Sequence, residues 1–474
     1  MPEERPLTIK DAAAALRAGT VTAAGLTRDM LDRIGKSNEA LGAYVTVCEE
    51  TAMETAAAAD RDFAAGIDVG PLQGIPLAVK DIIATKDAPT TANSRVLAAD
   101  WGGGIDAPVV GRLRAAGSVV LGKTTTSEFA CGAPDPDKGF LIPRNPWNTD
   151  HTAAGSSSGT GIAVAAGLAF GGLGTDTGGS VRGPASVNGH TGLKVTFGRV
   201  PKAGVVPLGY TLDSVGPMAR SAYDCALLLE VMAGYHPDDR FASHTGVPAY
   251  SQALTGSVEG VRIGVATPYF FDSPELDGEV RDAVLSAVEV LKSAGAIVTE
   301  VSVPYAKLAK EANHITLVAE AYAYHRQNLI DRWTDYGKFT RPTLVKGALF
   351  TAGDYAQAQR LRTAFRAEVR KVLAAVDVIL TPSMLTPAER IDEMDMQKRM
   401  LGPGFTGQWN LAGLPAAAVP CGFSGSGLPL SMQIVGSPFA EATVLSIADA
   451  YQQLTDWHLQ VPPVPELATA ELVA

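Results

Sequence analysis

The chain has 474 residues, of which 46% are hydrophobic and 19% charged, and its formal net charge is −11. Such a composition is typical of a globular protein that buries a large core. The negative charge, without any cluster of lysine or arginine, argues against a nucleic-acid partner. The longest weakly polar run, 159–174, is shorter than the about 20 residues that span a bilayer, so we expect no membrane segment.

The four cysteines are far apart and form no CxxC pair: Cys48, Cys131, Cys225 and Cys421. This spacing favours neither a zinc site nor a disulfide framework, and it suits a reducing compartment. The N-terminal segment is polar and shows no hydrophobic region of a signal peptide. We therefore expect a cytoplasmic protein without a bound metal.

The first elements are predicted as helices with a buried strand after them. Thr8 and Asp11 are spaced like a capping box and Gly19 provides a stop, so a helix is expected over 8–16. Two further helices are expected over 23–34 and 49–65. A strand over 74–80 then ends in Lys80, and a helix over 108–116 leads into a strand over 118–121.

The second half continues the alternation of strands and helices. Helices are predicted over 162–169 and 280–294, and strands over 193–195, 261–265, 297–301, 416–423 and 428–436. The segment 305–399 is expected to be helical, apart from a strand over 378–380, and to lie peripherally where it shapes a substrate pocket. This pattern predicts an α/β fold: a single large domain, 1–474, with a central mixed, twisted sheet covered by helices on both faces.

One stretch matches a phosphate-binding motif. Residues 117–124 read GSVVLGKT, which has the spacing of a P-loop. A P-loop is a flexible loop between a strand and a helix, whereas the central residues here are themselves the predicted strand. Their backbone N–H groups are used by neighbouring strands, so we interpret the stretch as ordinary structure and not as a nucleotide site.

A second stretch matches the nucleophile elbow of α/β-hydrolases. Residues 155–159 read GSSSG, which would make Ser157 the nucleophile. The elbow follows directly on a strand, but the residues before it are turn-rich and polar. The elbow also needs a histidine, and His190, which follows Asn188 and Gly189, is better interpreted as a structural residue in a turn.

A larger set of motifs, taken together, resembles the amidase signature family over nearly the whole chain. The stretch GSSSGTGIAVAAGLAFGGLGTDTGGSVR over 155–182 carries most of the resemblance. Ordered matches flank it: GIPLAVKD over 74–81, LGKT over 121–124, NPW over 145–147, GLK over 192–194, DSVGP over 213–217, GLP over 413–415 and VPCGF over 419–423. Ala153–Ala154 and Thr125 depart from residues common in the family, which leaves the subfamily open.

The resemblance implies a catalytic triad of Lys80, Ser156 and Ser180. Ser180 would be the nucleophile, and Ser156, after a cis peptide bond, would pass its proton to a neutral Lys80. A serine hydroxyl needs such a base, and burial after the apolar run 75–79 would lower the pKa of the lysine. The loop Thr177, Gly178, Gly179 and Ser180 would supply backbone N–H groups to the oxyanion.

Further residues are expected around this triad. Asp176 and Arg182 are predicted to form a bracing ion pair, and Asp81 to support the lysine. The resemblance places Ala130, Cys131 and Gly132 on the wall of the acyl pocket. Arg199 and Lys202 either reach the pocket rim or, as we favour, are solvated.

The reaction implied is cleavage of an amide C–N bond through an acyl-enzyme, without a cofactor. The substrate would be a small molecule, either an amide (aryl amides included) or a carbamate (urethane). Whether the chain forms a homodimer is left open. Two alternatives remain: a glutamine amidotransferase subunit of a tRNA-dependent complex, which needs partner chains, and a binding-only relative, against which the intact triad argues.

Overall fold

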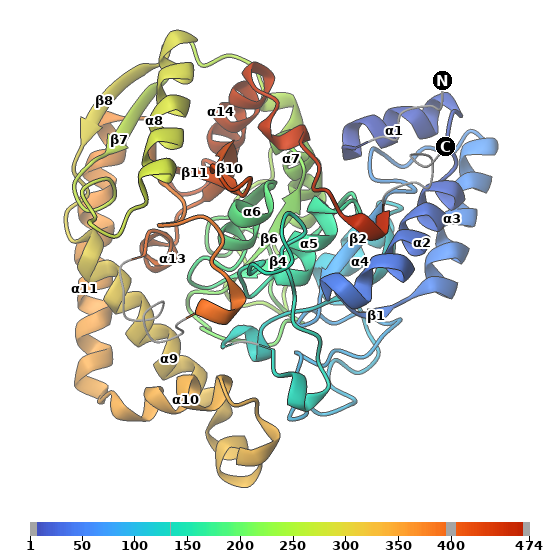
Figure 1. The fold of residues 1–474 in the computed structure, drawn as a ribbon, viewed down its shortest axis with the longest axis horizontal. Coiled ribbons are helices and arrows are strands. Elements are labelled where there is room, and N and C mark those ends of the chain that lie inside the picture. Colours follow the sequence, from blue (N-terminus) through green and yellow to red (C-terminus); the bar gives the residue numbers. More distant parts are fainter. Residues whose placement is uncertain (1–6, 133, 395–403, 468–474) are drawn as a thin grey trace.

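The computed structural model describes residues 7–132, 134–394 and 404–467. An eleven-stranded sheet runs through its centre in the order β1-β3-β2-β4-β6-β5-β10-β11-β9-β7-β8. Figure 1 shows the sheet crossing the molecule from the N-terminal helices to the α8 end. The strands are β1 Tyr44–Val47, β2 Pro76–Lys80, β3 Val119–Thr124, β4 Gly171–Asp176, β5 Thr191–Lys194, β6 Ser214–Ala219, β7 Arg262–Ala266, β8 Ile297–Val301, β9 Val378–Pro382, β10 Ala416–Phe423 and β11 Pro429–Gly436.

The sheet is mixed, as predicted. Strand β2 runs parallel to both β3 and β4, and β7 runs parallel to both β8 and β9. The strands between these two parallel groups pair antiparallel, from β4 and β6 through β5, β10 and β11 to β9. The fold is therefore a single α/β domain in which two parallel units are joined by an antiparallel centre.

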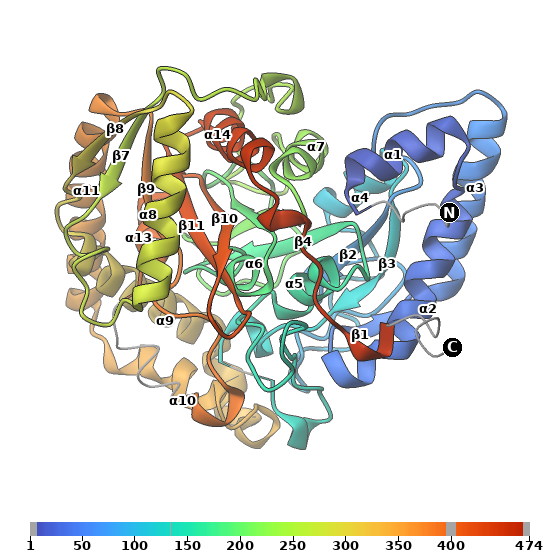
Figure 2. The same ribbon diagram turned by 45° about the horizontal axis from the view of Figure 1, so that its top comes forward.

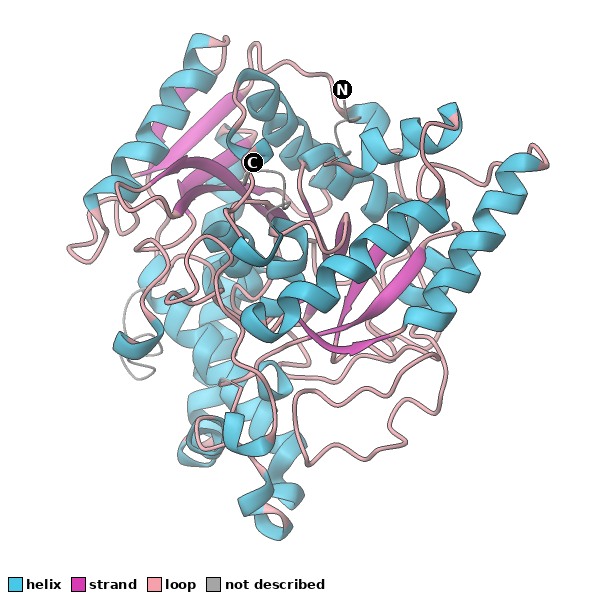
Figure 3. Ribbon diagram, turned by 45° about the vertical axis from the view of Figure 1, so that its right-hand side comes forward, coloured by secondary structure: helices cyan, strands magenta, loops and turns pink. Residues whose placement is uncertain are grey.

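Helices cover both faces of this sheet (Figures 2 and 3). Helices α8 and α11, for example, lie on opposite sides of the β7 to β9 end in Figure 2. The helices are α1 Ile9–Ala18, α2 Ala23–Leu41, α3 Glu49–Ala64, α4 Pro108–Ala115, α5 Ser158–Ala165, α6 Arg182–Asn188, α7 Ala222–Met232, α8 Gly278–Ser293, α9 Ala306–Asp331, α10 Thr340–Val345, α11 Ala352–Ala375, α13 Gly407–Ala412 and α14 Glu441–Leu454. Among the described residues, no helix has the length and apolar character needed to cross a bilayer.

Local sequence signals placed the starts of the individually predicted helices within about two residues, apart from that of α5, whereas α6, α7, α13 and α14 were not predicted. The Thr8 side chain accepts a hydrogen bond from the N–H of Asp11, and Gly19 ends α1 in the left-handed region, at a φ of 70°. The helix predicted over 162–169 is displaced, because α5 begins at Ser158 and ends at Ala165. The chain turns at Gly167, whose φ of 64° is incompatible with a right-handed helix.

Three strands were not predicted: β1, β4 and β6. Strand β4 is GGLGTD, which has low strand propensity and resembles a turn. Its glycines are required by close packing: a Cβ on Gly172 would lie 2.6 Å from Ala78 O, and one on Gly174 would lie 2.6 Å from Met218 Sδ. The neighbouring elements, which sequence alone does not position, therefore select glycine in this strand.

The segment predicted as helical and peripheral, 305–399, contains α9, α10 and α11, at the lower left of Figure 1. It also contributes β9, which pairs with β11 and β7 inside the sheet. Residues 395–399 lie outside the described residues. The stretch that matched a P-loop is largely strand β3, and its Lys123 forms a buried ion pair with Asp81 at 3.2 Å, which agrees with its interpretation as ordinary structure.

Candidate active site

Three neighbouring parallel strands bring the predicted site residues to one edge of the sheet. Strand β2 ends in Lys80, β4 leads into the loop 177–180, and β3 leads toward the segment 127–132. In open parallel sheets, ligands bind beyond the carboxyl ends of such strands. This arrangement brings Lys80 and the loop that carries Ser180 to the same edge of the sheet, because β2 and β4 are parallel neighbours.

Lys80 is fully buried at this edge. Its Nζ lies 2.6 Å from Ser156 Oγ and 2.8 Å from Thr175 Oγ1. Burial lowers the pKa of Lys80 to about 7, although the Asp176 and Asp213 carboxylates act in the opposite direction. At neutral pH a large fraction of this amine is therefore unprotonated and able to accept a proton.

The two neighbouring serines of the first glycine-rich turn have different environments. A cis peptide bond joins Gly155 to Ser156, and Ser156 O accepts a hydrogen bond from the N–H of Ser127 at 3.3 Å. The Ser157 hydroxyl is buried and engages the backbone of Thr175, donating to its carbonyl and accepting from its N–H, each at 3.2 Å. Ser157 braces β4 and is not placed as a nucleophile.

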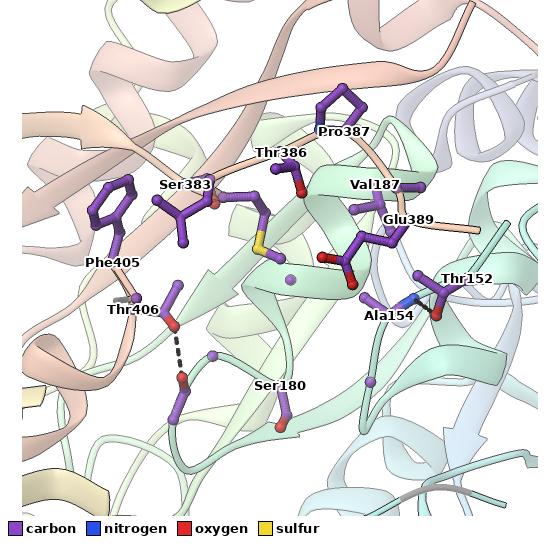
Figure 4. A pocket seen from close by; sticks show the side chains of 18 of the residues that line it. Thr152, Ala154, Ser180, Val187, Ser383, Thr386, Pro387, Glu389, Phe405 and Thr406 are labelled. Atoms are coloured by element: carbon purple, nitrogen blue, oxygen red, sulfur yellow. Dashed lines mark hydrogen bonds between the residues drawn. The ribbon is translucent and has the colours of Figure 1, made fainter. Parts of the chain in front are cut away.

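The loop that carries Ser180 is held from both sides. The Thr177 hydroxyl donates to Asp213 at 2.6 Å, and the Thr406 hydroxyl donates to the Gly178 carbonyl at 2.6 Å (Figure 4). Within the described residues, the N–H groups of Thr177, Gly178 and Ser180 have no acceptor. Gly178 and Ser180 also line a cavity at Ser180, whereas Thr177 does not, so the oxyanion role of this loop stays a prediction.

Gly179 differs from the expectation for this loop. Its N–H donates to Asp176 Oδ1 at 2.7 Å, so this N–H is already satisfied by a buried carboxylate. We therefore leave Gly179 out of the set of oxyanion donors. Its contribution is conformational, because its φ of 131° lies in a region that side chains disfavour.

Asp176 and Arg182 form the ion pair expected from the sequence. Arg182 Nη2 lies 2.9 Å from Asp176 Oδ1, with both side chains fully buried. Burial opposes ionisation of Asp176, but the Arg182 charge and hydrogen bonds outweigh it and hold the pKa of that carboxyl below its usual range. Arg182 also donates to Gln433 Oε1 at 2.6 Å and to the Thr406 carbonyl at 3.0 Å, which ties the Ser180 loop to β11.

Two cavities meet at Ser180. The first, which we name the Thr406 chamber, has a volume of about 380 Å³; Figure 4 shows Ser180, Thr406 and Glu389 on its wall. The second, the Phe339 chamber, has a volume of about 350 Å³ and is lined by Ser156 as well as by Ser180. A substrate bound at Ser180 can thus extend in two directions.

Two of the three residues predicted for the acyl pocket line a chamber, and the third lies behind its wall. Ala130 and Gly132 line the Phe339 chamber, whereas Cys131 does not. Cys131 is buried, and its carbonyl accepts a hydrogen bond from the Thr340 hydroxyl at 3.3 Å. From the segment 305–399, which was expected to shape the substrate pocket, Phe339 lines this chamber.

The remaining cationic candidates lie away from both chambers. Arg199 is buried rather than solvated and lies 3.8 Å from Glu441. Lys202 is within 4.8 Å of the ring centroids of Tyr210, Phe197 and Phe241. His190 is buried against the Thr191 carbonyl, 3.0 Å away, and burial lowers its pKa to about 4, as suits a structural histidine.

Sequence reasoning did not anticipate three contributors to the site, Thr175, Asp213 and Thr406, and it placed Phe339 only among the aromatic side chains of a segment expected to shape the pocket. Thr175 could have been found, since it lies in the glycine-rich stretch beside the triad residues. Thr406 and Phe339 come from segments more than 150 positions after Ser180, and no local pattern marks them. Their roles depend on how those segments fold back over the sheet.

Comparison with known proteins shows the family to which the chain belongs. The profile described as Amidase matches residues 25–445. A glutamyl-tRNA(Gln) amidotransferase subunit from Chloroflexus aurantiacus is 39% identical over 98% of this chain and 99% of its own length. The peptide amidase of Stenotrophomonas maltophilia superposes with a TM-score of 0.82 at 30% identity, over 94% of this chain and 98% of that chain.

A further solved structure, a glutamyl-tRNA(Gln) amidotransferase subunit from Thermotoga maritima, has a TM-score of 0.81 at 28% identity, over 97% of this chain and 99% of that chain. The family profile, the sequence relatives and the solved structures each match nearly the whole chain, and each of these matches is to an amidase or an amidotransferase subunit. The protein therefore belongs to the amidase signature family, whose members act on amides.

Proposed function

We propose that this chain cleaves an amide C–N bond through a covalent acyl-enzyme on Ser180. The observation that carries the proposal is the contact between Lys80 Nζ and Ser156 Oγ at 2.6 Å, in a site where burial lowers the lysine pKa to about 7. An exposed lysine would be protonated and could not serve as a base. The buried amine can accept a proton through Ser156 and so activate the partly exposed Ser180.

The bond changes are those of a two-step acyl transfer. Ser180 Oγ attacks the carbonyl carbon, its proton passes to Ser156, and the Ser156 proton passes to Lys80. The tetrahedral oxyanion is stabilised by the N–H groups of the 177–180 loop other than that of Gly179, and losing one such donor typically costs about 10²–10³ in rate. The C–N bond then breaks as Ser156 returns a proton to the leaving nitrogen, and water hydrolyses the Ser180 ester by the same relay.

A second candidate is that the amide is glutamine and that the released ammonia serves a partner. It is favoured by the names of relatives such as the Chloroflexus aurantiacus protein, at 39% identity over 98% of this chain. In this case the chain would work as one component of a complex. The first candidate covers simple amides, aryl amides and carbamates, among which the triad does not discriminate because each presents an attackable carbonyl.

The reaction class is tested by a hydrolysis screen of primary amides, anilides, carbamates and glutamine. The variants Lys80→Ala, Ser156→Ala and Ser180→Ala are compared with Ser293→Ala, the same kind of change at the exposed end of α8. We expect Ser180→Ala to lose about 10⁴–10⁶ in kcat and Ser293→Ala to match the wild type. Near-normal turnover by Ser180→Ala would show the mechanism to be wrong.

The second candidate is tested separately by isolating the protein from its native cells. Stable co-purification of partner chains, together with glutamine-dependent ammonia release that rises in their presence, would support it. A lone chain that hydrolyses simple amides at full rate, and glutamine poorly, would support the first candidate.

A further inference from the structure

The two chambers at Ser180 differ in chemistry. Glu275, Glu389 and Glu393 line the Thr406 chamber, whereas the described residues that line the Phe339 chamber carry no charge. The wall of the Phe339 chamber is largely apolar and includes Ala130, Ile142, Pro143, Phe339 and Ile391. A charged group that enters this chamber loses its hydration without gaining a partner from these residues, whereas an apolar group gains by leaving water.

Phe339 belongs to a short segment that is attached at three points to the loop after β3. The Gly337 N–H donates to Glu128 Oε2 at 2.8 Å, and the Lys338 N–H donates to Asp135 Oδ2 at 2.9 Å. On the other side of Phe339, the Thr340 hydroxyl donates to the Cys131 carbonyl at 3.3 Å. Phe339 is therefore held at the chamber by bonds on both sides of it in the chain.

The contact between these two segments is also sterically close. A Cβ on Gly132 would lie 2.8 Å from Thr340 Oγ1, and one on Gly337 would lie 2.9 Å from Glu128 Oε2. The Glu128 carboxylate is itself buried and accepts the Ser94 hydroxyl at 2.6 Å. Because these bonds fix the backbone on both sides of Phe339, the segment that carries this wall residue is preorganised.

We propose that Phe339 is a specificity-determining residue: it forms the wall against which an uncharged, apolar part of the amide substrate packs, and Glu128 and Asp135 position it there. The proposal deepens the proposed function, on which it rests, by naming the substrate class. That class is an amide with an alkyl or aryl group on one side of the scissile bond and no charge on that group. Free glutamine is outside the class, because its far end carries both an ammonium and a carboxylate.

The experiment uses two series of amides with growing alkyl chains. One series lengthens the acyl group of a primary amide, and the other lengthens the N-alkyl group of acetamide, so that one of them extends into the Phe339 chamber. Burial of one methylene stabilises by about 0.8 kcal/mol, which corresponds to a rise in kcat/KM of roughly fourfold per carbon. We expect this rise in one series with the wild type, and a drop of tenfold or more when the chain ends in a carboxylate.

Variants then assign the effect to Phe339. We expect Phe339→Ala to flatten the rise with chain length, so that kcat/KM falls about tenfold more for the longest amide than for acetamide. Phe339→Leu should restore most of the rise, and Glu128→Gln should weaken it without abolishing turnover of acetamide. Phe350→Ala, an aromatic residue of the same region that does not line the chamber, is the matched control and should keep the wild-type profile.

A binding measurement distinguishes failure of this proposal from failure of the proposed function. The same amides are titrated into Ser180→Ala, whose affinity for them does not depend on turnover. A chain-length dependence that disappears on adding Phe339→Ala supports the proposal even if the wild type cleaves none of the series. Absence of the dependence in both series, or its persistence in Phe339→Ala, would overturn it.

Discussion

Lys80 Nζ and Ser156 Oγ lie 2.6 Å apart, although 76 positions separate these residues in the chain. The contact forms because β2 and β4 are parallel neighbours and α5 begins where the first glycine-rich turn ends. It places a buried amine against a hydroxyl, with the Thr175 hydroxyl 2.8 Å from the same nitrogen. The chemistry proposed for the site depends on this contact and on the burial that accompanies it.

The first prediction concerns the pH dependence of activity. Burial lowers the pKa of Lys80 to about 7, and only the neutral amine acts as a base. We expect kcat/KM to fall about tenfold per unit as the pH drops below this value, and to level off above it. The measurement is a pH profile on a neutral amide, and a flat profile between about pH 5.5 and 8.5 would contradict the assigned base.

The second prediction concerns the Asp176–Arg182 pair. Asp176→Asn leaves the Arg182 guanidinium buried without its carboxylate, and breaking such a pair typically costs about 3–5 kcal/mol. We expect the free energy of unfolding to drop by that order in urea denaturation. Glu49→Gln breaks the exposed Arg28–Glu49 pair and serves as the control, with an expected loss below about 1 kcal/mol. Equal losses in the two variants would show that the buried pair does not brace the loop.

The third prediction concerns Gly179. A side chain is strained at its φ of 131°, and a Cβ there would overlap the Thr406 hydroxyl. We expect Gly179→Ala to displace the Ser180 loop and lower kcat by about 10² or more, through lost alignment of the oxyanion donors. Gly111→Ala is the control, because a Cβ at Gly111 meets no atom within 4 Å. Activity of Gly179→Ala within a factor of about three of the wild type would contradict this role.

The fourth prediction concerns a second buried lysine, Lys194. Burial and the nearby Arg182 charge lower its pKa to about 7, from an ordinary 10.5. Between about pH 7 and 10.5, Lys194 is therefore protonated in the unfolded chain and neutral in the folded chain. Because the unfolded state binds the extra proton, the free energy of unfolding rises as the pH increases through this range. Below about pH 7, folding instead buries a charge.

Lys194→Met removes this buried charge while keeping an extended side chain. We expect the free energy of unfolding to increase by about 1 kcal/mol at about pH 6.5, relative to the wild type, and the difference to shrink or reverse by about pH 9.5. Thermal denaturation at the two pH values measures it. The lost bond from Nζ to the Val195 carbonyl, at 2.8 Å, acts against the gain at both pH values. A difference that does not depend on pH would show that the charge of Lys194 is not responsible.

The sequence was most informative where local physics decides the structure. A capping pattern predicted α1, alanine-rich composition predicted α3 and amphipathic periodicity predicted α8, each to within about two residues. The strand character of 118–121 was enough to argue against a phosphate loop at the P-loop-like stretch. Sequence reasoning failed at β4, where glycines usually found in turns form a central strand because the neighbouring elements leave no space for side chains.

For the site, the ordered motifs around Lys80, Ser156 and Ser180 determined the family and nominated the triad from sequence alone. Only the tertiary structure decided which N–H groups of the 177–180 loop lack an acceptor. The Gly179 N–H donates to Asp176, whereas the other N–H groups of the loop have no acceptor within the described residues. It also decided that Cys131 supports the chamber wall while Phe339 lines it. Hydrogen-bond partners, burial and cavity walls come from segments distant in the chain, and a local pattern does not record which of them will meet.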